Sequence, residues 1–242
     1  MIIGGGTLIN VVAIAIGTLL GLFMGKKFHS ELRDLLTQAM GFVVLIAAAD
    51  SLRTFWDRKF QDSFDRGVSI LVILFSFAIG ALLGHWSGIE RRLESFGTSL
   101  KNRFSKDENP RFVEGFLAAS ILFGVGPMAV LGGISDGMGE GIELLILKST
   151  LDFFMSIMFA ATYGWGVGLS AIPVGIYQFV WTGVGLGLGE ILSDVQVQAL
   201  TITGGVLLIG IALGSMGIKR VAVGNLLPAI FIAPVLAGFL AR

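Results

Sequence analysis

The sequence predicts an all-α polytopic membrane protein with about eight transmembrane segments. Hydrophobic residues make up 54% of its 242 residues, charged residues make up only 14%, and the mean hydropathy is +0.85. A soluble domain usually carries about 25% charged residues. Several apolar runs also reach the roughly 20 residues that cross a bilayer as a helix. The short segments of alternating polarity that are typical of a membrane β-barrel are not visible.

Each predicted segment is a mainly apolar run of the sequence. The first lacks the basic leader and cleavage site of a signal peptide, so we expect it to be retained as a helix. The fourth and fifth contain a break and two charges, and a re-entrant hairpin around 124–140 is the alternative to two full spans. The segments are 3–24, 36–52, 67–89, 112–134, 143–163, 170–191, 199–217 and 225–241.

The distribution of Lys and Arg predicts the orientation of these segments. Eleven basic residues fall in the loops after segments one, three and seven, against five on the opposite side. Because cytoplasmic loops are enriched in basic residues, both termini are expected outside and loop 90–111 inside. Within that loop, Leu93, Phe96, Leu100 and Phe104 recur at helical spacing. We expect an amphipathic helix on the anionic lipid surface, with binding of a partner protein as the alternative.

An internal repeat is the second strong signal. Residues 21–51 align without gaps to residues 185–215 at a constant offset of 164, matching Gly21 to Gly185 and Gly41 to Gly205. A chance match of glycine-rich apolar sequence is the alternative. If real, the repeat divides one membrane domain (1–242) into a three-helix unit (1–89), the loop 90–111, a central helix pair (112–169) and a second, inverted unit (170–242). Inverted repeats around broken helices are common in secondary transporters.

The central pair carries the candidate polar site. Lys148 and Asp152 are four residues apart, so they share a helix face, and Ser149 lies close to it. Each charge in a span costs about 2.5–3.5 kcal/mol on insertion scales, and such charges often mark a transport pathway. A purely structural ion pair is the alternative.

Three other residues and one further pair complete this hypothesis. Gly126 and Pro127 break the fourth segment, and Asp136 lies where the chain turns back. Helix breaks expose amides and carbonyls that can bind ions, although a simple kink would also explain them. Asn10 and Gln178 occupy different repeats and are candidates for opposite sides of one pathway. Hydrogen bonds between helices, worth about 0.6 kcal/mol each, are the simpler explanation.

Composition and motifs limit the other partners. Glycine faces at helical spacing would permit close helix packing or a homodimer. They are Gly17, Gly21 and Gly25, then Gly80, Gly84 and Gly88, and then Gly183, Gly185, Gly187 and Gly189. The net charge is zero, which gives no reason to expect nucleic acid, and there is no cysteine. No HExxH, P-loop or protease motif occurs, so we expect neither an enzyme nor a metal or other cofactor.

The motifs GPMAVLGGISDG, LILKSTLDF and GVGLSAIP, together with the opening GGGTLIN, resemble a known family. It is the bacterial inner-membrane family that includes YqgA and YdfK, a domain of unknown function. The resemblance implies a multi-span protein of the bacterial inner (plasma) membrane and implies no substrate. The matching positions are Gly126, Pro127, Asp136, Gly137, Lys148, Ser149, Asp152, Ser170 and Pro173.

The leading hypothesis is therefore a secondary transporter or channel for a small ion or solute, with its site at the broken central helices. The alternative is a structural or regulatory membrane subunit that binds a partner through residues 90–111. An enzyme acting on lipid is the weakest reading, because the sequence shows no paired nucleophile and base.

Overall fold

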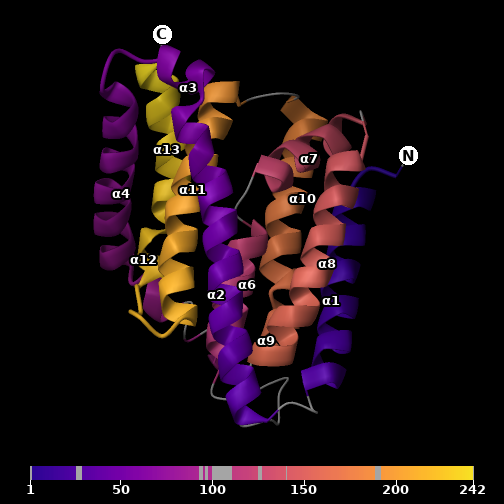
Figure 1. The fold of residues 1–242 in the computed structure, drawn as a ribbon. Helices are drawn as coiled ribbons and strands as arrows, with labels where there is room; N and C mark the ends of the chain where they lie inside the picture. The colour runs from indigo at the N-terminus through magenta and orange to yellow at the C-terminus, as the bar shows by residue number, and fades with distance from the viewer. Residues whose placement is uncertain are drawn as a thin grey trace. The chain divides into compact units, whose positions relative to one another are not determined.

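The computed structural model describes residues 2–25, 29–92, 95, 98–99, 111–124, 127–139, 141–188 and 192–241 (Figure 1). Within these ranges all regular structure is helical, which confirms the predicted fold class. Among the described residues, seven helical segments are long and apolar enough to cross a membrane. A bent pair of helices makes an eighth span if the pair is counted as one. Most of the predicted helix 90–111 lies outside the described residues.

The chain forms two compact units that cut across the predicted repeat boundaries. The first comprises Met1–Met40, Glu94–Gly124 and Met128–Ile191, and the second comprises Gly41–Leu93, Val125–Pro127 and Leu192–Arg242. The first therefore holds helices from both predicted repeats, and so does the second. Helix α2 (Ser30–Arg53) contributes to both units.

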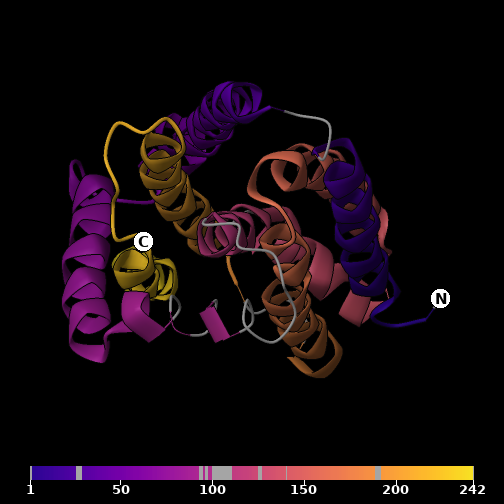
Figure 2. The same ribbon diagram turned by 90° about the horizontal axis from the view of Figure 1, so that it is seen from below.

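The first unit contains α1 (Gly5–Gly25) and the helices from the middle of the chain. Helix α8 (Glu143–Tyr163) has the predicted limits, and the short α9 (Gly166–Leu169) leads into α10 (Ala171–Leu188). Helix α1 packs against both α8 and α10 (Figures 1 and 2). The three helices that surround the candidate site thus come from distant parts of the sequence.

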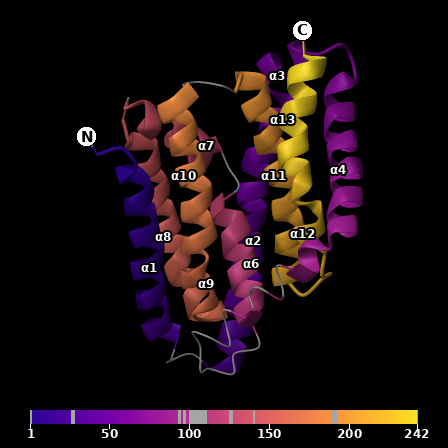
Figure 3. The same cartoon turned by 180° about the vertical axis from the view of Figure 1, so that it is seen from behind.

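The predicted fourth segment is two helices, α6 (Phe112–Gly124) and α7 (Pro127–Met138). They are bent by 58° relative to each other. In Figures 1 and 3, α7 lies beyond α6, toward the end of the unit where α8 begins. This arrangement favours a broken span over a hairpin that returns to its starting side.

Glycines bring α1 and α8 into backbone contact. A Cβ atom on Gly17 would lie 2.5 Å from the carbonyl oxygen of Phe153, and one on Gly21 would overlap that of Ile157. A Cβ on Gly25 would lie 2.6 Å from the carbonyl oxygen of Ala161. Since the contacts advance together along both helices, α1 and α8 run in parallel.

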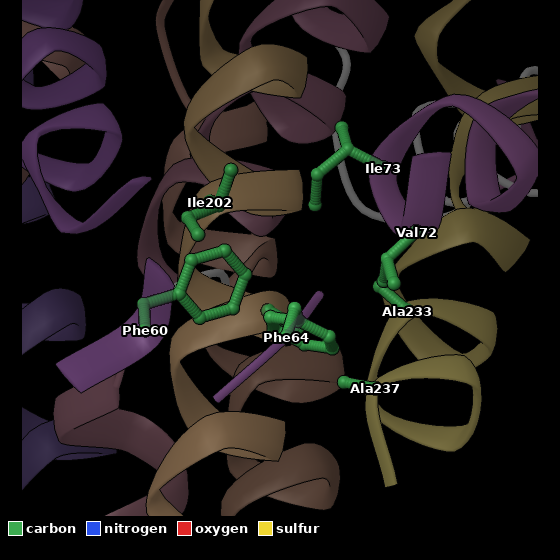
Figure 4. Close-up of a cluster of buried hydrophobic side chains, with 8 residues drawn as sticks. Phe60, Phe64, Val72, Ile73, Ile202, Ala233 and Ala237 are labelled. Atoms are coloured by element: carbon green, nitrogen blue, oxygen red, sulfur yellow. The ribbon is translucent and has the colours of Figure 1, made fainter. Parts of the chain in front are cut away.

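The second unit is built around α11 (Asp194–Ser215). The turn η1 (Thr54–Trp56) and α3 (Arg58–Asp62) cover one end, and α4 (Val68–Ser87) packs against α12 (Val223–Leu226) and α13 (Pro228–Leu240). Figure 4 shows its hydrophobic core. The core comprises Phe60, Phe64, Val72, Ile73, Ala199, Ile202, Ala233 and Ala237.

Within this unit, a glycine of α2 packs against an alanine carbonyl of α11, and a glycine of α11 packs against an alanine carbonyl of α2. A Cβ atom on Gly41 would lie 3.2 Å from the carbonyl oxygen of Ala212, and one on Gly205 would lie 3.1 Å from that of Ala48. The two helices are therefore antiparallel.

Some predicted helix limits were wrong for identifiable reasons. Helix α2 begins at Ser30 rather than 36, because a helix continues past the apolar run into polar sequence. Helix α11 begins at Asp194 rather than 199, because Ser193 and Gln196 form a capping box. The last segment is divided at Leu227, which keeps helical dihedral angles, because the following Pro228 has no amide hydrogen to donate to the helical hydrogen-bond ladder.

The glycine faces differ in what they contact. The face on α1 packs against α8, and on α4 a Cβ at Gly80 would lie 2.7 Å from the amide of Ala229. These two faces are used for packing inside the chain, which is one of the two alternatives that the sequence left open. A Cβ added to Gly183 or Gly187 of α10 would have nothing within 4 Å among the described residues. A homodimer stays a prediction for that face.

Candidate functional site

An ion pair lies in the interior of α8. The Lys148 ammonium donates a hydrogen bond of 2.5 Å to Asp152 Oδ2, as the four-residue spacing predicted. Lys148 is 7% exposed and Asp152 is 6% exposed. Charged side chains are almost never buried without a partner of opposite charge, and each of these two residues provides that partner for the other. The other carboxylate oxygen, Asp152 Oδ1, does not take part in this hydrogen bond.

Asn10 of α1 faces this pair. Gly6 contacts Leu145 of α8 and Gly17 contacts Ser156, so the turn of α1 between them lies opposite the turns that carry Lys148 and Asp152. Asn10 is fully buried there and lies close to the Asp152 carboxyl. The parallel packing of α1 on α8 therefore places the amide beside the charges.

Gln178 of α10 faces the same part of α1. The hydroxyls of Thr7 and Thr182 are 3.4 Å apart, and Val11 Cγ2 would lie 2.8 Å from a Cβ on Gly175. Gln178 is between Gly175 and Thr182 on one face of α10, so its side chain lies toward α1 one turn from the threonine contact. The structure thus brings Asn10 and Gln178 to a common interface, where the sequence could only suggest opposite sides of a pathway.

The two amides differ in how well they are satisfied. Both polar atoms of Gln178 are buried without a hydrogen-bond partner among the described residues, whereas the Asn10 amide makes no well-aligned hydrogen bond but interacts with the Asp152 carboxyl. An unpaired buried polar group costs about 1–3 kcal/mol, and most buried polar groups avoid that cost. The two unpartnered atoms of the Gln178 amide are therefore difficult to explain by packing alone. We call Asn10, Lys148, Ser149, Asp152 and Gln178 the polar cluster.

Ser149 contributes less directly to the polar cluster. Its hydroxyl is buried and donates a 2.5 Å hydrogen bond to the carbonyl of Leu145, so only its lone pairs face outward. One turn beyond Asp152, the hydroxyls of Ser156 and Thr18 are also buried and unpartnered among the described residues. Ser156 therefore extends the polar face of α8 one turn past the ion pair, whereas Thr18 contacts Gly168 of α9.

Asp136 has a different position from the one its sequence context suggested. It is buried at 2% exposure, and its two carboxylate oxygens accept hydrogen bonds of 3.1 Å from the backbone amides of Gly4 and Gly6. A helix leaves its first amides unpaired and attracts negative charge at that end. Asp136 thus caps α1 from another helix and fixes the position of the turn that precedes Asn10.

The helix break is only partly described. Gly126 lies outside the described residues, and Pro127 begins α7 with a side chain that is not described. Beyond the break, α7 packs closely on α10, where a Cβ on Gly133 would lie 3.1 Å from the carbonyl oxygen of Gln178. The break thus allows α7 to reach the helix that carries one amide of the polar cluster.

Sequence reasoning missed three hydroxyls that border the polar cluster. Thr7, Thr18 and Thr182 are all at most 4% exposed. Their spacing was a usable signal, because Thr7 is three residues before Asn10 and Thr182 is four residues after Gln178. No group of three His, Cys, Asp or Glu side chains that could hold a metal occurs in the described ranges.

The helices and buried polar groups define a multi-pass α-helical membrane protein. Comparison with known proteins then gives the family. The model of a family described as "Protein of unknown function (DUF554)" matches residues 5–238, and the chain belongs to this family. This confirms the resemblance found in the sequence.

Two relatives cover nearly the whole chain. The "Uncharacterized membrane protein YdfK" of Bacillus subtilis (strain 168) is 31% identical over 234 residues, which are 95% of this chain and 94% of the relative. The "Uncharacterized protein YqgA" of Escherichia coli (strain K12) is 25% identical over 241 residues, 94% of each chain. No solved structure matches the chain significantly.

Proposed function

We propose that this membrane protein is a secondary transporter or channel for a small ion or solute, and that the polar cluster is its binding site. The observation that carries the proposal is the buried Lys148–Asp152 pair with the Asn10 amide beside it and the unpartnered Gln178 amide on the neighbouring helix α10. A structural ion pair does not account for the unpartnered Gln178 amide. A ligand that passes through the cluster would supply the missing hydrogen bonds.

Each residue has a role in this proposal. Lys148 and Asp152 provide the charges, while the two amides can both donate to and accept from a ligand. Asp136 positions α1, and the break at Gly126 and Pro127 allows α7 and α6 to move separately. The proposal includes no enzymatic reaction.

The inverted repeat is part of the proposal and is supported by the helix contacts. At the offset of 164, Gly41 corresponds to Gly205 and Ala48 to Ala212. The Gly41–Ala212 and Gly205–Ala48 contacts are thus one contact made twice, as a two-fold relation requires. Val11 and Gly175 are also equivalent positions, and they touch each other. In both cases the paired helices are antiparallel, which fits repeats of opposite orientation in a membrane.

Cysteine labelling tests this topology. Lys59 of α3 and Lys219 after α11 are exposed, and α3 and the α11–α12 connection lie at opposite ends of the second unit (Figure 1). We expect Lys59→Cys to react with an impermeant maleimide added outside spheroplasts and Lys219→Cys to react only from the cytoplasm. Labelling of both from one side would contradict the inverted repeat, and a reversed pattern would contradict only the orientation.

Transport into proteoliposomes tests the function. We expect net uptake of at least one member of a panel of inorganic ions, small carboxylates and amino acids into vesicles that contain none of it, and loss of this net uptake in Asp152→Asn. The control is Thr150→Ala, because Thr150 lies on the exposed side of α8. Folding of each variant is verified by its thermal unfolding.

No uptake of any panel member by folded wild-type protein would contradict the proposal. Unchanged uptake by a folded Asp152→Asn variant would remove the polar cluster from it. If deletion of 93–110 also abolished function in cells while Asp152→Asn did not, the partner-binding subunit would be the better assignment.

A further inference from the structure

The Lys148–Asp152 pair is neutral as a whole, and few other charges are near it among the described residues. Helices α1, α9 and α10 contain no Asp, Glu, Lys or Arg, and Tyr177 is the titratable group of α10. Helix α7 contributes Asp136, which is bound to the amides of Gly4 and Gly6. Helix α6 carries Glu114, which is exposed, as is Glu143 at the start of α8. Lys148 and Asp152 therefore balance only each other.

Burying a net charge is much more costly than burying a compensated pair. The empty polar cluster is neutral, because Lys148 is positive and Asp152 negative. Binding an ion alone would leave one net charge in the interior. If the proton is the second ion, neutrality is restored in two ways, by adding a proton to Asp152 together with an anion, or by removing a proton from Lys148 when a cation binds.

We infer that the polar cluster transports one monovalent ion in electroneutral combination with one proton, the proton being exchanged at the Lys148–Asp152 pair. This inference rests on the proposed transport function and specifies its substrate class and coupling. An anion would travel with the proton, and a cation would travel against it. In both cases every state that crosses the membrane has a neutral site.

The amides explain how the ion is bound once the pair opens. A proton on Asp152 frees the Lys148 ammonium, and the amide nitrogens of Asn10 and Gln178 add donors for an anion. A proton lost from Lys148 frees the Asp152 carboxylate, and the two amide oxygens add acceptors for a cation. The hydroxyls of Ser156 and Thr18, which have no partner among the described residues, can serve either.

Proteoliposomes that contain a pH-sensitive dye test the coupling. Chloride, nitrate, sodium and potassium gradients are imposed in turn, with the membrane potential clamped. We expect one ion gradient to drive proton movement, with a tenfold gradient balanced by a pH difference of about one unit, since each is worth about 1.4 kcal/mol. Changing the clamped potential should leave this balance unchanged, whereas one uncompensated charge would shift it by about 2.3 kcal/mol per 100 mV.

Variants separate coupling from simple loss of function. If the ion is an anion, Asp152→Asn fixes the protonated state, so net flux should be lost while exchange of labelled for unlabelled anion persists. If it is a cation, Lys148→Gln should behave in the corresponding way. The doubly neutral variant, Lys148→Met with Asp152→Leu, should lose both net flux and exchange, and Thr150→Ala should retain both.

The outcomes distinguish this inference from the proposed function. Ion flux that depends on membrane potential and moves no protons would overturn the coupling and leave transport intact. Transport of neutral or zwitterionic solutes alone would also overturn the coupling and leave the proposed transport function intact. No flux of any ion or solute through folded protein would overturn the proposed function itself.

Discussion

The ammonium of Lys148 and the carboxylate of Asp152 form one hydrogen-bonded pair that is almost completely buried in α8. Removing one partner leaves a buried unpaired charge, which typically costs about 3–5 kcal/mol. We expect Lys148→Met and Asp152→Leu each to lower the free energy of unfolding by about that amount. The double variant should recover most of the loss, as measured by thermal unfolding in detergent. Losses that simply add would show that the two charges are not coupled.

The cap that Asp136 provides for α1 should be measurable separately from transport. Asp136→Ala leaves the amides of Gly4 and Gly6 unpaired, and loss of a helix cap typically costs about 0.5–2 kcal/mol. We expect faster hydrogen exchange at the start of α1 and lower thermal stability, with a smaller effect for Asp136→Asn, which keeps one acceptor oxygen. Unchanged exchange in the alanine variant would argue against the cap.

The α1–α8 contact should tolerate no side chain at Gly21, where a Cβ would overlap the carbonyl oxygen of Ile157. We expect Gly21→Ala to destabilise the protein by about 1–3 kcal/mol, the usual cost of overpacking. Gly183→Ala is the matched control, because it changes the same residue type in a helix with open space around it. Equal thermal stability of the two variants would contradict the packing.

The contact between α1 and α10 can be tested by a disulfide, because the chain has no native cysteine. Val11 and Gly175 are close enough that cysteines at both positions should meet the geometric requirements of a disulfide. We expect Val11→Cys with Gly175→Cys to cross-link on mild oxidation, detected by altered gel mobility that reducing agent reverses. Leu8→Cys with Gly175→Cys should remain uncross-linked, since Leu8 faces outward.

Local sequence signals predicted the parts of the fold and site that depend on neighbouring residues. The limits of α8 were predicted because an apolar run of the right length begins at Glu143 and is followed by Gly164. The ion pair was predicted because residues four apart on a helix are necessarily neighbours. The start of α11 was missed although its signal, Ser193 with Gln196, is equally local.

The role of Asp136 could not be predicted in the same way. Its partners are backbone amides, and every residue except proline has one, so no residue type in the sequence identifies Gly4 and Gly6 as the donors. The interface shared by Asn10 and Gln178 depends likewise on how α1 and α10 pack. That packing is set by contacts between residues more than 160 positions apart, such as Val11 and Gly175.

The sequence by itself determined the membrane class, most helix positions and the charge pair, because hydropathy and helical spacing are properties of adjacent residues. Only the tertiary structure decided which polar groups meet. Asn10 and Gln178 become a candidate site when glycines allow α1 to approach α8 and α10 closely enough to bury both amides. Asp136, which the sequence placed among the site residues, is positioned by the same packing to cap α1.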